Sequence, residues 1–167
     1  GIAAICRNVN FGDLNVEFHI YGAGAERKEI EQFLSKTPGC GIYLHAAVNR
    51  DEVPHILGSH DGALIPLARR IYGAVPSKIY EAMASGLPII FYGEGEGANI
   101  VKENQVGWAP RTGNILELEN SIREFSRDSE TRTLYSANGI KCASNIFDRG
   151  IQIRKLNDYL VAAMCQP

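Results

Sequence analysis

The chain has 167 residues, 45% of them hydrophobic and 22% charged, which suits one globular domain with a full hydrophobic core. Its formal net charge of -2 argues against a nucleic-acid partner that is bound through phosphate neutralisation, and no apolar run approaches the roughly 20 residues of a membrane-spanning helix. The four scattered cysteines lack C-x-x-C spacing, which argues against a zinc or redox motif and favours reduced thiols in the cytoplasm.

Strands alternate with helices over the first two thirds of the predicted elements. Strands that are apolar along their whole length and joined by helices imply a parallel sheet covered on both faces. The sequence therefore predicts an α/β fold with a doubly wound, Rossmann-like parallel sheet and a helical C-terminal third, as a single domain over residues 1–167. Strands are predicted at residues 16–21, 41–46, 62–67, 88–93 and 106–110, and helices at 1–9, 26–34, 52–57, 78–85 and 99–104, with two or three more between 115 and 164.

Helix ends carry their own signals. Asp51 and Ser77 are the predicted N-caps of the helices that follow them, and Gly86 is the predicted end of the second of these. Residues 149–164 place apolar side chains on one helical face, so this helix is expected to pack on the core or to cross to another domain.

Doubly wound sheets bind ligands at the carboxyl ends of their strands. The loops at residues 21–24, 45–50, 66–78 and 92–98 are therefore the places to expect a site. Gly22 and Gly24 follow a strand and open a helix, where bare backbone N–H groups can face a phosphate. Arg27 stands where a dinucleotide fingerprint has its third glycine, which disfavours that motif and leaves a tight turn without a ligand as the alternative.

The segment VPSKIYEAMASGLPII, residues 75–90, is more specific. It resembles the signature P-S-K-x-Y-E-x-M-A-x-G-x-P of family-4 glycosyltransferases, in the nucleotide-sugar-binding C-terminal domain of their GT-B fold, especially in bacterial enzymes of capsule and lipopolysaccharide assembly. The matching residues are Pro76, Ser77, Lys78, Tyr80, Glu81, Met83, Ala84, Gly86 and Pro88. Weaker likeness extends to both sides, over nearly the whole chain.

Glu81 is the central candidate for donor binding. It lies one turn into its helix, where a carboxylate can accept two hydrogen bonds from the vicinal hydroxyls of a ribose, and the resemblance implies the same role. The alternative is a carboxylate that only favours the helix dipole. Lys78 either meets the diphosphate or lies in solvent, and Ser77 is a cap, a ligand contact or both. Pro76 fixes the backbone of the loop before them.

Further residues of other loops complete the candidate donor site. His45 ends a strand at the ligand edge and is a candidate contact to the base. Glu96, with Glu94, is a candidate acceptor for sugar hydroxyls in a loop whose alternative is plain solvation. Many relatives carry a glutamate eight positions before the one matched by Glu81, but Gly73 stands there, so backbone groups of residues 72–75 are expected to hold the sugar instead.

The resemblance also implies a mechanism and partners. It implies retaining transfer from a nucleoside diphosphate sugar, a UDP-sugar by expectation, without a metal or other cofactor; no Asp-x-Asp occurs in the chain. It further implies a missing N-terminal domain that binds the acceptor sugar or lipid-linked glycan, and a missing strand, glycine-rich turn and basic residue before residue 1. The enzyme is expected in the cytoplasm, peripheral at the inner membrane face, and this fragment alone is expected to be inactive.

Two other functions stay open. A UDP-sugar 2-epimerase shares this sheet architecture, although the P-S-K-x-Y-E signature is not matched there. A non-catalytic nucleotide or NAD-binding module would use residues 22–27 as a degenerate fingerprint. It predicts an acidic residue at the end of the next strand, and residues 41–49 offer none.

Overall fold

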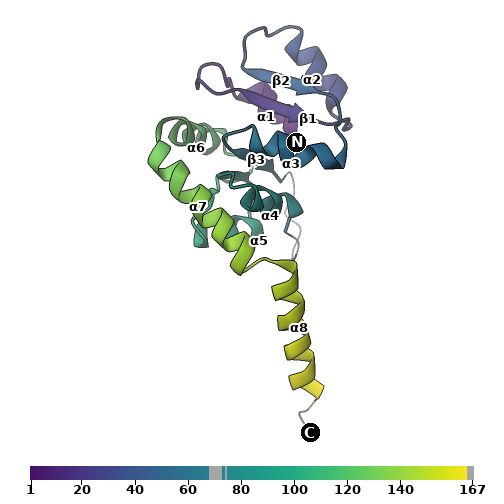
Figure 1. The fold of residues 1–167 in the computed structure, drawn as a ribbon. Helices are drawn as coiled ribbons and strands as arrows, with labels where there is room; N and C mark the ends of the chain where they lie inside the picture. The colour runs from purple at the N-terminus through teal and green to yellow at the C-terminus, as the bar shows by residue number, and fades with distance from the viewer. Residues whose placement is uncertain (68–72, 74, 165–167) are drawn as a thin grey trace.

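The computed structural model describes residues 1–67, 73 and 75–164 (Figure 1). Strands and helices alternate as predicted, and three helices form the C-terminal third. The strands are β1 (Phe18–Tyr21), β2 (Ile42–His45), β3 (Ala63–Pro66), β4 (Ile89–Tyr92) and β5 (Gly107–Trp108). The helices are α1 (Ile2–Asn8), α2 (Arg27–Leu34), the 3-10 turn η1 (Arg50–Glu52), α3 (Val53–Gly58), α4 (Ser77–Ala84), α5 (Glu96–Glu103), α6 (Ile115–Arg127), α7 (Ser129–Asn145) and α8 (Arg149–Met164).

All strand pairs are parallel, but the strands form two half-sheets instead of one continuous sheet. One half-sheet pairs β1 with β2, with Phe18 opposite Ile42 and Tyr21 opposite His45. The other has the order β3-β4-β5, with Ala63 opposite Ile89. The sequence did not reveal this split, because which strands pair is not a local property of the sequence.

One hydrophobic core covers the same face of both half-sheets. Side chains at alternate positions of β1, β2, β3 and β4 meet α1, α2 and α6 in this core. Ile5 of α1, Ile90 of β4 and Leu118 of α6 are its nearly inaccessible members, at 1%, 6% and 0% exposure. Because this core continues across both half-sheets, they lie in one layer rather than as two separate sheets.

A second core covers the opposite face of β3, β4 and β5. Ile89 and Phe91 of β4 pack there against Ile79 and Met83 of α4, and all four side chains are fully buried. Members of α5 and α7 complete this core, and Leu57 of α3 packs against it. The sheet is therefore doubly wound, with helices on both faces, as predicted.

Two of the predicted N-caps are wrong. The 3-10 turn η1 begins one residue before Asp51, so the N-cap position falls on Asn49, whose backbone N–H donates to the Glu52 carboxylate at 2.9 Å. Helix α4 takes its N-cap from Pro76, with extended backbone at φ -60° and ψ 128°, and Ser77 is its first helical residue. Proline presets the extended backbone that precedes the helix, but its side chain accepts no hydrogen bond from the first N–H groups of α4.

The predicted end of α4 at Gly86 is confirmed. Gly86 has φ +68°, its N–H donates to the Met83 carbonyl at 3.0 Å, and the Leu87 N–H donates to the Ala82 carbonyl at 2.9 Å. This is a Schellman motif, in which a left-handed glycine lets the last carbonyls of a helix find donors. It turns the chain directly into β4.

Helix α8 does not pack on the core. It extends away from the rest of the molecule (Figure 1), and none of its residues is buried. Leu156, Tyr159 and Leu160 are 56%, 72% and 49% exposed. The expectation of core packing is therefore wrong, whereas docking on another domain stays a prediction. Within the described residues, no helix is both long and apolar enough to cross a membrane.

Candidate functional site

The first turns of α4 carry the signature residues at the surface. Ile79, Ala82 and Met83 face the core, as predicted, and this fixes the opposite side of the helix toward solvent. Ser77, Lys78 and Glu81 lie on that exposed side. The Ser77 hydroxyl donates to Oε1 of Glu81 at 3.0 Å, across one turn of the helix. Ser77 thus orients the carboxylate rather than capping the helix, and leaves Oε2 of Glu81 for other donors.

Lys78 and Glu81 line a cavity of about 950 Å³ together with His45. Tyr21, at the end of β1, lines the same cavity. The end of the cavity that these four residues line, here called its mouth, therefore lies at the carboxyl ends of β1 and β2 and beside the start of α4. The cavity combines a cation, a carboxylate and aromatic rings on three elements. An ammonium suits a phosphate, a carboxylate suits hydroxyls, and flat rings suit a base.

The described lining of the cavity does not include the other sequence-predicted residues, namely Gly22, Gly24, Gly73, Ser77, Pro76 and Glu96. Gly73 has φ +71°, which glycine adopts readily. Its neighbours Tyr72 and Ala74, whose backbone was expected to hold the donor sugar, lie outside the described residues.

The glycine turn after β1 is organised by Arg27. One guanidinium nitrogen of Arg27 donates to the Gly22 carbonyl at 2.8 Å and to the His45 carbonyl at 2.7 Å. Arg27 therefore ties the turn to the end of β2, and it forms an ion pair with Glu31 one turn later, at 2.9 Å. Sequence reasoning read Arg27 only as the residue that breaks a fingerprint, and missed this structural role.

Glu96 begins α5 and does not lie in a loop. The N-cap is Gly95, with φ +86°, so the helix starts three residues earlier than predicted. Gly93 and Gly97 on either side leave room for the Phe91 ring, since a Cβ at either would lie 2.7 or 2.6 Å from a ring atom. Gly93 and Gly97 therefore reflect packing on Phe91, which favours a structural role for these two glycines.

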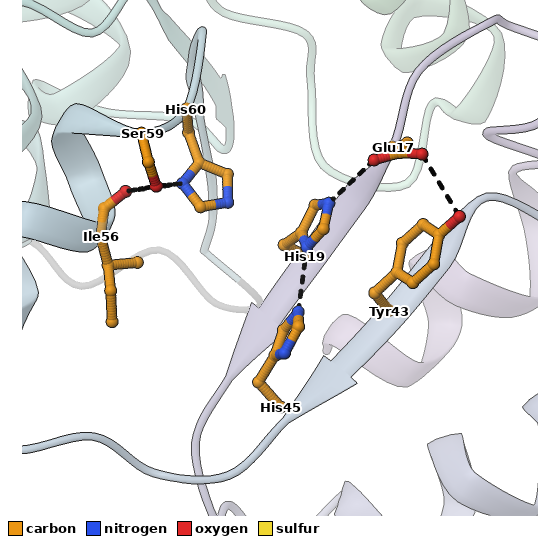
Figure 2. A network of polar contacts seen from close by, with 7 residues as sticks. All are labelled: Glu17, His19, Tyr43, His45, Ile56, Ser59 and His60. Atoms are coloured by element: carbon orange, nitrogen blue, oxygen red, sulfur yellow. Dashed lines mark hydrogen bonds and ion pairs between the residues drawn. The ribbon is translucent and has the colours of Figure 1, made fainter.

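A cluster of histidine and tyrosine rings lies on one face of β1 and β2, and Figure 2 shows His19, Tyr43, His45 and His60 of this cluster. His19, Tyr21, His45 and His60 line the cavity. Nδ1 of His19 lies 2.9 Å from Nε2 of His45, and the His19 ring stacks on Tyr43 with centroids 4.8 Å apart. The Tyr21 ring stacks on His45 at 4.3 Å. His60 meets two rings of β1 edge-on, His19 at 5.1 Å and Tyr21 at 5.9 Å between centroids.

Electrostatics follow from this crowding. Partial burial lowers the pKa of His45, and the neighbouring rings of His19 and His60 lower it further. The lowered pKa favours the neutral form of the His45 ring. Glu17 accepts from the Tyr43 hydroxyl at 3.3 Å, and its negative charge raises the pKa of that phenol.

Sequence reasoning singled out His45 but missed His19, Tyr21, Tyr43 and His60. The signal was the alternation in FHIY and IYLH, in which histidine and tyrosine occupy every second position of otherwise apolar strands. In the parallel register His19 lies opposite Tyr43 and Tyr21 opposite His45, so four polar rings share one face. No group of three or more histidine, cysteine or acidic side chains in the described residues is arranged to hold a metal ion.

Known structures place this fold among glycosyltransferases. TarM of S. aureus, solved with UDP, has a TM-score of 0.73 at 18% identity over 93% of this chain. HepE of Anabaena, solved with UDP-glucose, has a TM-score of 0.72 at 17% identity over 93%. WaaG, a glycosyltransferase involved in lipopolysaccharide biosynthesis, has a TM-score of 0.69 at 17% identity over 86%. At these identities the likeness concerns the fold alone.

The chain spans only part of those proteins: 31% of TarM, 44% of HepE and 38% of WaaG. No curated protein sequence matches it. The sequence profile of the family described as glycosyl transferases group 1, however, matches residues 3–142, which is most of the chain. This chain therefore belongs to the glycosyl transferases group 1 family.

Proposed function

We propose that this chain is the donor-binding part of a GT-B glycosyltransferase and that it holds a nucleoside diphosphate sugar at the mouth of the cavity. The observation that carries the proposal is the meeting of Lys78, Glu81 and His45 on one cavity at the carboxyl ends of parallel strands. The Glu81 carboxylate accepts hydrogen bonds from the ribose hydroxyls, and the Lys78 ammonium contacts the diphosphate. The base lies against the rings of His45 and Tyr21.

A UDP-sugar is the proposed donor. Structural neighbours support this choice, since HepE was solved with UDP-glucose and the pneumococcal O-GlcNAc transferase GtfA with UDP and GlcNAc. The proposed reaction is retaining and independent of metal, as the resemblance to family-4 enzymes implies. The diphosphate leaving group is then stabilised by N–H groups at helix N-termini and by basic side chains.

The acceptor binds elsewhere in the proposed enzyme. We assign a sugar or lipid-linked glycan acceptor to a second, N-terminal domain, and a role in bacterial surface polysaccharide synthesis, for which the likeness to WaaG gives support. A lipid-linked acceptor fits an enzyme in the cytoplasm that is peripheral at the inner membrane face. Gly22, Gly24, Pro76, Ser77, Gly73 and Glu96 remain proposed to surround the donor.

The test is ligand-observed NMR and calorimetry of this chain with UDP, GDP, UDP-GlcNAc and NAD. UDP or its sugar is expected to bind preferentially, with or without EDTA. Glu81→Gln keeps the shape of Glu81 but removes its charge, and should weaken binding by tens-fold, since hydrogen bonds to charged groups contribute about 1.5–3 kcal/mol each. Glu103→Gln, at the exposed end of α5, is the matched control and should leave affinity unchanged.

Two results would contradict the donor site. NAD binding that ignores Glu81→Gln would favour a nucleotide-binding module of another kind. UDP binding that is equally strong in Glu81→Gln and the unmodified chain would move the nucleotide away from α4. Release of free sugar from UDP-GlcNAc by this chain would instead favour the epimerase-like alternative.

A further inference from the structure

Glu17, His19 and His45 form a row of hydrogen-bonded side chains along one face of β1 and β2 (Figure 2). Oε2 of Glu17 lies 3.3 Å from Nε2 of His19, and Nδ1 of His19 lies 2.9 Å from Nε2 of His45. The other oxygen of Glu17 accepts from the Tyr43 hydroxyl, which helps to hold the carboxylate in place. The row ends at Nδ1 of His45, a cavity-lining residue, and this nitrogen makes no hydrogen bond within the described residues.

The two imidazole rings share one linear hydrogen bond. Their planes differ by 8°, and their centroids lie 5.2 Å apart. Two centroids cannot lie farther apart than the N···N distance plus one ring radius on each side, and 5.2 Å reaches that limit for a contact of 2.9 Å. The rings therefore meet edge to edge and in line, which is the favourable geometry for an N–H···N bond. Such a contact holds one proton, because two N–H groups would repel and two bare nitrogens would lack a donor.

These contacts fix the tautomers of both rings. A carboxylate only accepts, so the proton of a neutral His19 lies on Nε2, facing Glu17. Nδ1 of His19 is then bare and accepts from the Nε2–H group of His45. A neutral His45 carries no second proton, so its Nδ1 is a hydrogen-bond acceptor.

An added proton always reaches the free end of the row. When the pair of rings takes up one proton, three N–H groups have to be placed. One faces Glu17, one lies between the rings, and the third can lie only on Nδ1 of His45. This holds whichever ring is protonated first, because the shared proton can shift between the two nitrogens. Nδ1 of His45 is therefore an acceptor in the neutral pair and a donor in the protonated pair.

The surrounding groups leave the row intact. Nδ1 of His60 lies 2.6 Å from the Ile56 carbonyl, which only accepts, so a neutral His60 carries its proton there and donates nothing to the row. Within the described residues, no other side chain is hydrogen bonded to a ring nitrogen of His19 or His45. The other charged or titratable groups that line the cavity or contact His45 are Tyr21 of β1, Arg27 of α2, Asp61 after α3, Lys78 and Glu81 of α4, and Arg132 of α7.

We propose that Glu17 and His19 are positioning residues that hold His45 in one tautomer, and that Nδ1 of His45 selects the base of the donor by accepting its ring N–H group. This inference rests on the proposed donor site, in which the base lies against His45. Uracil presents an N–H group at N3, whereas cytosine has a bare nitrogen there, and two facing acceptors repel. The site therefore selects uracil over cytosine while the pair of rings is neutral, and it loses this selection when the pair is protonated.

Calorimetry with UDP and CDP tests the selection. The two nucleotides share ribose and diphosphate, so the ratio of their affinities isolates the base. At pH 8 UDP should bind at least about ten-fold more tightly than CDP, and this ratio should fall to about two or less at pH 5.5. His19→Phe keeps a ring but removes both nitrogens, so it should lower the ratio at pH 8 to about two. Tyr43→Phe leaves both histidines in place and should keep the ratio and its pH dependence.

Long-range ¹H–¹⁵N NMR of the histidine side chains tests the tautomers without any nucleotide. At pH 8 His19 and His45 should both show a bare Nδ1 and a protonated Nε2. His60 should show the opposite tautomer, because its Nδ1–H group donates to Ile56, and it is the internal reference. A proton on Nδ1 of His45 at pH 8 would overturn the proposal.

The binding results separate this inference from the donor site itself. Equal affinities for UDP and CDP at pH 8, or a ratio that stays the same at pH 5.5 or in His19→Phe, would overturn the base selection. If Glu81→Gln still weakens the binding of both nucleotides in that case, the donor site stands and only the selection fails. Binding of neither nucleotide would contradict the donor site and the selection together.

Discussion

Glu117 illustrates how one carboxylate organises a helix start. Nε and the backbone N–H of Arg111 donate to it at 2.9 and 3.0 Å, and these bonds lower the pKa of Glu117 from 4.5 to about 2. A carboxyl whose pKa is lower in the folded than in the unfolded chain stabilises the fold above pH 4.5, and this contribution is lost as the pH falls toward 2.

Glu117→Gln should therefore lower the urea midpoint at pH 7, and the difference from the unmodified chain should shrink steadily between pH 4.5 and 2. The measurement is a series of urea unfolding curves across this range. Glu119→Gln, on the same helix, is the control. A difference that stays constant with pH would show that the glutamine acts through packing and not through the lost charge.

His45 is a base whereas Glu117 is an acid, but the stability that each contributes falls in the same direction, as the pH is lowered. Its pKa is lowered in the folded chain by burial and by the rings of His19 and His60, so folding disfavours its protonation. The contribution of His45 to the free energy of unfolding is therefore fully present above its ordinary pKa of 6.5 and declines as the pH falls below that value.

His45→Gln should consequently lose less stability than the unmodified chain between pH 7 and 5. Thermal unfolding at intervals of half a pH unit measures the difference. His55→Gln, on the exposed side of α3, should follow the unmodified chain. Parallel curves for His45→Gln and the unmodified chain would contradict the assignment of the pH dependence to this ring.

At the scale of elements, the C-terminal end of α4 combines backbone and packing constraints at Gly86. An alanine there would have to keep φ at +68°, and its Cβ would lie 3.1 Å from Cδ1 of Ile140 and 3.3 Å from the Ser136 hydroxyl, both on α7. Gly113 has φ +86° with no atom within 4 Å of an added Cβ, so it isolates the backbone strain alone.

Gly113→Ala should cost about 1 kcal/mol of unfolding free energy, and Gly86→Ala about 2 kcal/mol, because crowding against α7 adds to the strain. Denaturant unfolding measures both values, provided that the dependence of the unfolding free energy on denaturant concentration is the same in each variant. Equal losses for the two variants would mean that α7 yields to the methyl group without cost.

Element types were largely predictable from the sequence, and their ends less so. Apolar runs such as IIFY predicted strands, because a strand that is buried on both faces consists of apolar residues. Gly86 predicted a helix end, because few residues other than glycine accept a positive φ. Ser77 misled because proline at the N-cap position had already fixed the helix start. Helix α5 begins three residues before its predicted start. Its N-cap Gly95 has a positive φ, which helix propensity alone does not reveal.

At the scale of the whole molecule, the sequence predicted which residues would come together better than what surrounds them. Lys78, Glu81 and His45, all singled out from the sequence, line one cavity in the structure, and their role in donor binding stays a prediction. The ring cluster depends on the register between β1 and β2, and the split into two half-sheets depends on which strands are neighbours. Neither property is local in sequence, so neither could be read from spacing.

Helix α8 is the part of the molecule whose removal should matter least for folding. None of its residues is buried, and within the part of the chain that the structure describes its hydrogen bonds to the preceding segment end on Asp148 and Ile146. Deleting residues 149–167 should therefore change Tm by less than about 2 °C, since stability follows buried apolar area.

Deleting residues 129–167 is the informative comparison, because it also removes α7, whose Cys142 belongs to the core beside α4. This longer deletion should abolish cooperative unfolding. Calorimetry of both variants separates the two helices. A fall of more than about 5 °C for the shorter deletion would mean that the apolar side chains of α8, among them Leu156 and Leu160, find a buried position on this domain in solution. An unchanged Tm would leave those side chains free for another domain, which is the role that their exposure favours.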